Sequence, residues 1–264
     1  MEHEAAKLAE QIAESPKYAV LSHDLVLRIC QEYLPRYKNQ KDVIKAVKKQ
    51  LHIIHGAFFP EKCHAKAMEL IGDSRLSDRD LSLQLMGLHP STKERLPSIE
   101  AFYDLLSPYL REAKTVLDIG CGFHPCAFPF MGLDSCVLYS AGDIDHGTVE
   151  VVRSFFQRMH VACDVRILDA ADDMPGENAD AAFLFKLVPV LEQQKKGLAY
   201  RLLENLGAKT AVVTFPIKSL SGREKDMVKF YGSQFEQNLP KGFTILRKEI
   251  VGSELVYIVS PKAP

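Results

Sequence analysis

The chain has 264 residues, 47% of them hydrophobic and 25% charged, and its formal net charge is -1 at pH 7. This size and composition are typical of a globular protein with one or two domains. No stretch approaches the roughly 18 uninterrupted apolar residues of a membrane span, and no basic segment followed by an apolar run opens the chain. We therefore expect a cytoplasmic protein without a membrane partner.

The small net charge conceals two basic zones. Residues 15–50 hold eight Lys and Arg against three acidic residues, and residues 209–248 show the same balance. The rest of the chain is therefore acidic. Zones of this kind suit a polyanionic partner such as a nucleic acid.

The six cysteines show no CxxC pairing, which favours reduced thiols over a disulfide framework. His52, His55, Cys63 and His64 lie close in sequence, but they lack the ligand spacings of a zinc site. We interpret them as packing residues and expect no bound metal.

From residue 5 to about 88 the apolar positions recur at three and four residues, which predicts helices broken at Pro16, Pro35, Pro60 and Gly72. In the segment 41–51, Val43, Val47 and Leu51 share one face, while lysines share another. We therefore expect an all-α domain over residues 1–88, with an apolar face that packs and a cationic face that is exposed.

From about residue 115 the pattern changes to short β-branched runs that alternate with helical stretches, as in a parallel sheet covered by helices. The expected strands are 115–119, 137–143, 165–168, 181–186, 211–215, 243–250 and 255–260. The last two are separated by a short connection through Gly252, so they should pair antiparallel. We expect an α/β fold over residues 89–264, whose mostly parallel seven-stranded sheet resembles that of the Rossmann-like class I methyltransferases.

Three features place a nucleoside site at the carboxyl ends of these strands. The first strand runs into the turn Gly120-Cys121-Gly122, Asp143 ends the second strand and Asp169 ends the third. Glycines permit close approach of a ligand, and a carboxylate after the second strand can accept hydrogen bonds from ribose hydroxyls. Dinucleotide binding is disfavoured because His124 and Pro125 stand where that fingerprint has its continuation to a third glycine.

If the chain is a methyltransferase, its sequence also limits which kinds of acceptor atom it can methylate. The Asp/Asn-Pro-Pro-Tyr/Phe motif of amine methylation is absent after the fourth strand, which reads Phe185-Lys186-Leu187-Val188-Pro189. Cys126 follows the glycine turn rather than a later strand, so we interpret it as packing and not as a nucleophile. An acceptor that is already nucleophilic, such as guanine N7, stays plausible, because it needs positioning more than a general base.

Several strings resemble one family, the aminoglycoside-resistance methyltransferases of 16S ribosomal RNA known as the Arm or Rmt group. They are His89-Pro90-Ser91-Thr92-Lys93-Glu94-Arg95-Leu96, the turn at 117–122, Phe185-Lys186-Leu187 with Pro189, and Phe215-Pro216-Ile217-Lys218-Ser219-Leu220-Ser221-Gly222-Arg223. Weaker similarity reaches Lys17-Tyr18, so the resemblance covers nearly the whole chain. The chain departs from the family at His124, where Asn is common, and at Glu224 and Asp226, where glycines are common.

The resemblance implies S-adenosylmethionine as cofactor, with Arg95 on its methionine carboxylate. Ser91 to Glu94 alone would be explained as a capping box that opens a helix. The expected cofactor-binding residues are Ser91, Thr92, Arg95, Asp118, Gly120, Gly122, Asp143, Ile144, Asp169, Ala170, Phe185 and Gln194. Lys186 and Arg223 are the expected catalytic residues at the target base or its phosphate.

The resemblance also implies that the helical domain docks on rRNA of the 30S subunit. Candidate RNA contacts are Lys17, Arg36, Lys41, Lys45, Lys48, Lys218 and Lys225. The expected reaction methylates N7 of a decoding-site guanine, which is flipped out of its stack, and gives resistance to 4,6-disubstituted aminoglycosides. The enzyme is expected to act as a monomer and not on DNA. Open alternatives are methylation of the neighbouring adenine or of a small molecule, and ribosome binding without catalysis.

Overall fold

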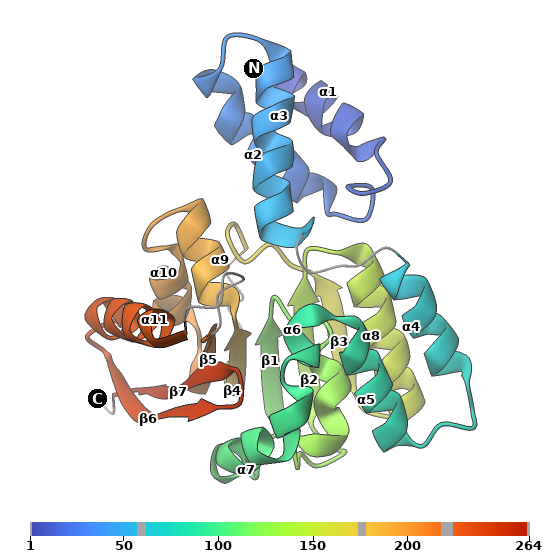
Figure 1. The fold of residues 1–264 in the computed structure, drawn as a ribbon, viewed down its shortest axis with the longest axis vertical. Coiled ribbons are helices and arrows are strands. Elements are labelled where there is room, and N and C mark those ends of the chain that lie inside the picture. The colour runs from blue at the N-terminus through green and yellow to red at the C-terminus, as the bar shows by residue number, and fades with distance from the viewer. Residues whose placement is uncertain (1, 57–61, 174–177, 218–223, 263–264) are drawn as a thin grey trace.

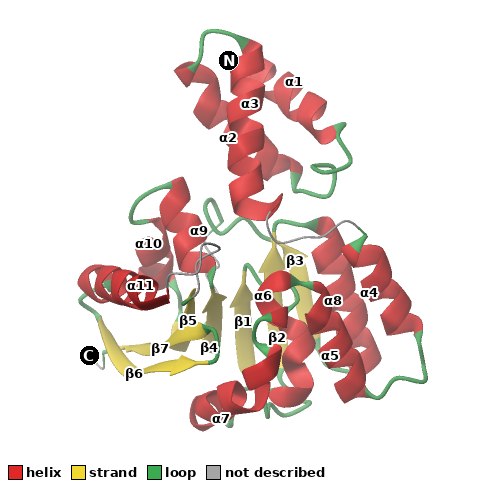
Figure 2. Cartoon of the chain, viewed as in Figure 1, coloured by secondary structure: helices red, strands yellow, loops and turns green. Residues whose placement is uncertain are grey.

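The computed structural model describes residues 2–56, 62–173, 178–217 and 224–262. A 7-stranded sheet in the order β3-β2-β1-β4-β5-β7-β6 lies at its centre. Figures 1 and 2 show a bundle of three helices beyond the ends toward which the parallel strands point. The fold therefore consists of a covered sheet and a helical bundle placed at its carboxyl edge.

The strands agree closely with the predicted ones. They are β1 Thr115–Ile119, β2 Leu138–Asp143, β3 Cys163–Ile167, β4 Ala179–Phe185, β5 Ala208–Pro216, β6 Phe243–Val251 and β7 Glu254–Pro261. The pairs of β1, β2, β3, β4 and β5 are parallel, and β7 pairs antiparallel with both β5 and β6. The predicted class of fold, including the terminal antiparallel pair, is confirmed.

Each face of the sheet has its own hydrophobic core, because successive side chains along a strand point to opposite faces. Val116 belongs to a core shared with helices α7 (Ile99–Leu110) and α8 (His146–Met159). Leu117 belongs to the other core, under α9 (Leu187–Gln194), α10 (Leu198–Asn205) and α11 (Glu224–Asn238). The central strands β1 and β4 are therefore buried on both sides, as expected for a parallel sheet, whereas the edge strand β6 is mostly exposed.

The bundle consists of α1 (Glu2–Ala13), α2 (His23–Tyr33) and α3 (Gln40–Leu51), with a short 3-10 helix η1 (Leu34–Arg36). Asn39 caps α3, because its side-chain oxygen accepts a hydrogen bond from Asp42 N at 2.9 Å. Val43, Val47 and Leu51 are buried in the core of the bundle, which is separate from the two cores of the sheet. The predicted apolar face of this helix is confirmed, and Lys41, Lys45 and Lys49 are exposed on the other side.

Two further helices precede the predicted domain boundary at residue 88, namely α4 (Cys63–Gly72) and α5 (Asp78–Leu88). Their buried residues, such as Ala67 and Leu85, lie in the same core as Val116 of the sheet. The change from one core to the other thus falls between Ile54 and Cys63. By packing, α4 and α5 belong with the sheet, and the division at 88 stays a prediction.

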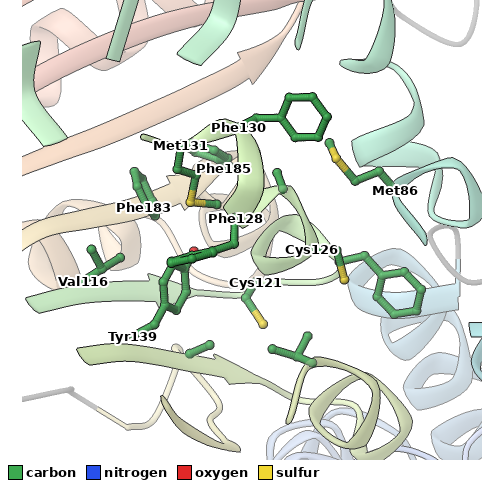
Figure 3. Packing of buried hydrophobic residues seen from close by; sticks show 14 of the residues in the cluster. Met86, Val116, Cys121, Cys126, Phe128, Phe130, Met131, Tyr139, Phe183 and Phe185 are labelled. Carbon is green, nitrogen blue, oxygen red and sulfur yellow. The ribbon is translucent and has the colours of Figure 1, made fainter. Parts of the chain in front are cut away.

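All six cysteines are free thiols, in agreement with the predicted absence of disulfides. Figure 3 shows Cys126 in the core that also contains Met86 of α5 and Tyr139 of β2. Its side chain is fully buried, which agrees with a packing role. Among the described helices, none combines the length and apolarity that a membrane span requires.

Candidate active site

A pocket of about 840 Å³, including its mouth, lies at the carboxyl ends of the strands. Gly120, Asp143, Asp169, Arg95 and Lys186 all line it, so the structure brings the five central predicted residues to one cavity. The complete lining is Ile54, His55, His89, Ser91, Arg95, Gly120, Cys121, Gly122, His124, Asp143, Ile144, Leu168, Asp169, Ala170, Phe185, Lys186, Leu187, Val190, Leu191 and Gln194.

The glycine turn after β1 requires both of its glycines. Gly120 and Gly122 have φ values of 62° and 50°, which other residues rarely adopt. A Cβ at Gly120 would lie 2.9 Å from a methyl carbon of Leu187, and one at Gly122 would lie 3.2 Å from the ring of His89. The turn therefore leaves room in the pocket that any side chain would fill.

Asp143, the last residue of β2, holds the turn in place. Its Oδ2 accepts a hydrogen bond from Gly122 N at 2.9 Å, and its Oδ1 accepts one from Asp145 N at 3.1 Å. Burial raises the pKa of this carboxyl to about 6, although the N–H of Gly122 opposes the shift. The free protein thus has a carboxyl group in the pocket that changes charge near pH 6.

Asp169 follows β3 and faces the pocket from the opposite wall. Its Oδ2 accepts from Arg28 Nε at 2.8 Å, and its Oδ1 accepts from Ala171 N at 3.0 Å. Arg28 also donates to Gln194 Oε1 at 3.0 Å. The sequence did not single out Arg28 as a site residue, because it lies in α2 and meets these partners only in the folded chain.

Arg95 lies in a buried ion pair at the other end of the pocket. Its Nε donates to Glu254 Oε1 at 2.9 Å and its Nη2 donates to Glu254 Oε2 at 3.0 Å, with both side chains 1% exposed. The guanidinium also lies over the rings of Phe102 and Phe185. Among the described residues its buried Nη1 has no hydrogen-bond partner, so the arginine that lines the pocket keeps an unsatisfied donor group.

Lys186 follows β4 and is the N-cap of α9, in a left-handed conformation with φ 55°. Its Nζ donates to Glu94 Oε2 at 2.7 Å and to Ser91 O at 3.1 Å, and it lies 3.7 Å from Glu254 Oε1. Its side chain is 8% exposed, so the lysine does not extend into solvent as a snorkelling residue would. The ammonium group lies where the pocket meets the segment 91–95.

The predicted capping box at Ser91 is wrong. Helix α6 (Pro90–Lys93) begins two residues earlier than a capping box at Ser91 requires, its N-cap is His89, and no side chain caps it. The carboxylate of Glu94 pairs with Lys186 instead of a backbone N–H, because a buried ammonium without an acceptor costs more free energy than an uncapped N–H.

Two residues that were predicted to bind cofactor do not line the pocket. Thr92 is buried and its hydroxyl donates to Met86 O at 2.7 Å. Asp118 shares a strand face with Val116, and its Oδ2 accepts from His124 Nδ1 at 2.6 Å and from Tyr139 Oη at 2.9 Å. Both side chains therefore lie outside the pocket and stabilise the segments that carry its lining residues.

Three histidines line the pocket although they were not predicted to. Burial lowers the pKa of His89 to about 3, and it also lowers the pKa of His124. His55 Nε2 lies 2.6 Å from Asp145 Oδ2. The sequence had shown His124 as a departure from the resembled family, His89 as the start of a family string and His55 as a packing residue, but none of these signals assigned a histidine to the pocket.

The basic residues predicted to contact RNA are partly described. Lys17, Arg36, Lys41 and Lys45 are exposed on the bundle, and Lys48 is half-buried. Lys218 and Arg223 lie outside the described residues, and of Lys225 only its place in α11 is described. The exposed candidates that the structure describes therefore all lie on the helical bundle.

The pocket fits an adenosyl amino acid in the chemistry of its lining. A carboxylate at Asp143 suits ribose hydroxyls, and the buried unpaired donor of Arg95 suits a carboxylate. The fold and this site define a class I methyltransferase, the class that uses S-adenosylmethionine.

Comparison with known proteins identifies the family. A family model described as "Ribosomal RNA methyltransferase (FmrO)" matches residues 14–258, so the chain belongs to that family of ribosomal RNA methyltransferases. It is 35% identical to the 16S rRNA (guanine(1405)-N(7))-methyltransferase of Serratia marcescens, over 94% of this chain and 95% of the relative. It is 30% identical to the enzyme of the same name from Micromonospora rosea, over 96% and 95% of the two chains.

Solved structures agree with this assignment. The 16S rRNA methyltransferase RmtF, crystallised with S-adenosyl-L-homocysteine, superposes with a TM-score of 0.91 at 35% identity, over 99% of this chain and 100% of that one. The 16S rRNA methylase RmtB superposes with a TM-score of 0.85 at 29% identity, over 98% of both chains.

Proposed function

We propose that this enzyme transfers a methyl group from S-adenosylmethionine to N7 of a guanine in the decoding site of 16S rRNA. The observation that carries the proposal is the gathering of Asp143, Asp169 and Arg95 around one pocket beside a cationic bundle. The names of its relatives, which specify guanine 1405 and N7, support the choice of nucleotide and atom. The enzyme acts in the cytoplasm, as a monomer, on the assembled 30S subunit.

The cofactor supplies an electrophilic methyl group on a sulfonium. In our assignment Asp143 accepts hydrogen bonds from the ribose hydroxyls, Asp169 and Gln194 face the adenine, and Arg95 Nη1 donates to the methionine carboxylate. The remaining contacts come from backbone and side chains that line the pocket between these three points, namely Ser91, Gly120, Gly122, Ile144, Ala170 and Phe185. Thr92 and Asp118 act indirectly, through the segment and strand that they stabilise.

The acceptor needs no general base, since N7 of guanine carries a free lone pair. Burial lowers the pKa values of His89 and His124 in the described lining, which makes both rings weaker bases than a free imidazole. Lys186, held by Glu94 and Ser91 at the edge of the pocket, contacts the flipped base or its phosphate. Arg223, which lies outside the described residues, has the same role in our proposal.

Docking on the subunit uses the exposed cations of the bundle, among them Lys17, Arg36, Lys41 and Lys45. Such contacts neutralise phosphates and position the enzyme, and they give binding that weakens as salt is raised. N7 methylation adds a fixed positive charge and removes a hydrogen-bond acceptor. Polycationic 4,6-disubstituted aminoglycosides then lose affinity by repulsion and by a lost contact.

Methylation of isolated 30S subunits tests the target. With labelled S-adenosylmethionine, the purified enzyme should mark one decoding-site guanine, which strand cleavage selective for N7-methylguanine will locate. Expression in a susceptible bacterium should protect against kanamycin and gentamicin but not against an aminoglycoside that does not contact that N7. A mark on the neighbouring adenine, activity on small molecules without ribosomes, or subunit binding without any mark would each refute the proposed target.

Cofactor affinity should fall as the pH is lowered through about 6. The ribose hydroxyls require the ionised form of Asp143, and burial raises the pKa of this carboxyl to about 6 in the free protein. Above pH 7 the group is already ionised, so affinity is constant there. Below pH 6 binding must release a proton, and affinity drops by up to about tenfold per pH unit.

Calorimetry with S-adenosylhomocysteine between pH 5 and pH 8, in buffers of different ionisation enthalpy, measures both the affinity and the proton release. The variant Asp143→Asn should bind more weakly and show no such dependence. An affinity that stays level down to pH 5 in the unmodified enzyme would contradict the ionised-ribose contact.

A further inference from the structure

The helical bundle forms part of the pocket wall. Ile54 is buried in the bundle's own core, and it also lines the pocket. Ile144, after β2, and Val190, in α9, likewise pack against the bundle core and line the pocket. The bundle, at the top of Figure 1, therefore covers the cofactor site as well as presenting cations to RNA.

Backbone hydrogen bonds fix the start of α2 to the wall of this site. Ser22 N donates to Ile144 O at 2.9 Å, and His146 N donates to Val20 O at 2.8 Å. Ser22 is also the residue that caps α2. Because an α-helix has a fixed rise and rotation per residue, the position of the first residues of α2 determines where its later side chains lie.

Arg28, in the middle of α2, uses that placement to reach two pocket residues at once. Its Nε lies 2.8 Å from Asp169 Oδ2 and its Nη2 lies 3.0 Å from Gln194 Oε1. The arginine side chain is 21% exposed and the aspartate side chain 10%, so water only partly screens the pair. A forked guanidinium can hold two acceptors in fixed relative positions, which an ammonium cannot do.

The two contacts also set the orientation of both acceptors. With Oδ2 held by Arg28 and Oδ1 held by Ala171 N, the carboxylate of Asp169 cannot rotate freely. Because the Oε1 of Gln194 accepts from Arg28, its Nε2 is directed away from the arginine, where it lies 3.5 Å from Val190 O. The wall that faces the adenine is thus ordered by a residue of the bundle.

We infer that Arg28 is a positioning residue of the cofactor site, which orients Asp169 and Gln194 for recognition of the adenine amino edge. The inference rests on the proposed function, because it uses the assignment of these two residues to the adenine. It gives the bundle a second role, in addition to RNA docking. Arg28 itself needs no contact with the cofactor.

The test compares two ligands in the full-length enzyme by calorimetry. One is S-adenosylhomocysteine, and the other is its hypoxanthine analogue, in which a carbonyl replaces the 6-amino group. Arg28→Ala should weaken binding of the first roughly tenfold and should reduce the preference over the analogue by a similar factor. Arg28→Lys should restore part of both, since an ammonium keeps the charge but lacks the planar fork that fixes the spacing of two acceptors. The matched control Arg201→Ala removes an exposed arginine from the groove next to Arg28 and should change neither value.

Three results would overturn the inference, namely unchanged binding of both ligands, equal weakening of both, or the same effect from Arg201→Ala. Should Arg28→Ala fail to fold, the partial loss in Arg28→Lys gives the same comparison. Failure of the proposed function has a different signature. In that case the enzyme would bind S-adenosylhomocysteine and respond to Arg28→Ala as expected, yet leave the decoding-site guanine unmarked.

Discussion

Replacing Asp143 with alanine should abolish measurable binding of S-adenosylhomocysteine. The substitution removes the acceptor assigned to the ribose hydroxyls, and it also releases the Gly122 N–H that Asp143 Oδ2 holds at 2.9 Å. Hydrogen bonds to a charged acceptor contribute about 1.5–3 kcal/mol each, so the loss of two ribose contacts predicts a fall in affinity of at least about a hundredfold. Calorimetry measures the affinity, and thermal unfolding shows whether the variant is folded.

A suitable control is Asp164→Ala, which removes an aspartate that lies on β3 with a side chain 53% exposed. It should bind the cofactor product as the unmodified enzyme does. If Asp143→Ala keeps its affinity while it remains folded, the ribose assignment is wrong.

Of the substitutions proposed for this enzyme, Glu254→Ala should cause the largest fall in the free energy of unfolding. Glu254 is 1% exposed, lies 2.8 Å from Arg95 Nη2 and 3.7 Å from Lys186 Nζ, and is the acceptor of the Arg95 fork. Burial alone would raise the pKa of Glu254, but the two cations hold it below its ordinary value. Removing the carboxylate leaves two buried cations without it, which predicts a loss of about 3–5 kcal/mol in the free energy of unfolding.

Urea unfolding of Glu254→Ala, Arg95→Met and the double variant Glu254→Ala with Arg95→Met measures this coupling. Because the double variant removes both members of the buried pair, its loss should be smaller than the sum of the two single losses. Lys209→Ala, which breaks an ion pair to Asp180 with a lysine side chain 80% exposed, should change stability little. Additive losses in the double variant would contradict an ion-pair role for Glu254.

The sheet and the centre of the pocket could be predicted because their signals are local. β-branched runs separated by helical stretches give the strands, and the glycine turn with Asp143 and Asp169 gives three points at one edge. The orientation of Asp118 was also predictable, since Val116 and Asp118 share a face of β1. The expectation that Asp118 binds the cofactor was drawn from the resemblance and did not use this alternation.

The contacts that connect distant segments could not be predicted from local patterns. Glu254 lies 159 positions from Arg95, and Asp169 lies 141 positions from Arg28. Each pair joins elements whose relative placement is set by packing of the whole chain. For the same reason helical periodicity found α4 and α5 but did not show that they pack on the sheet rather than in the bundle.

The shared use of Ile54, Ile144 and Val190 by the bundle core and the pocket restricts how chimaeras of these enzymes can be built. A bundle transplanted from a relative would place its own side chains in the wall of the cofactor pocket. Exchanging the bundle would therefore alter RNA docking and cofactor binding together. A bundle exchanged to change the RNA target must be matched to the segments after β2 and in α9 of the recipient enzyme.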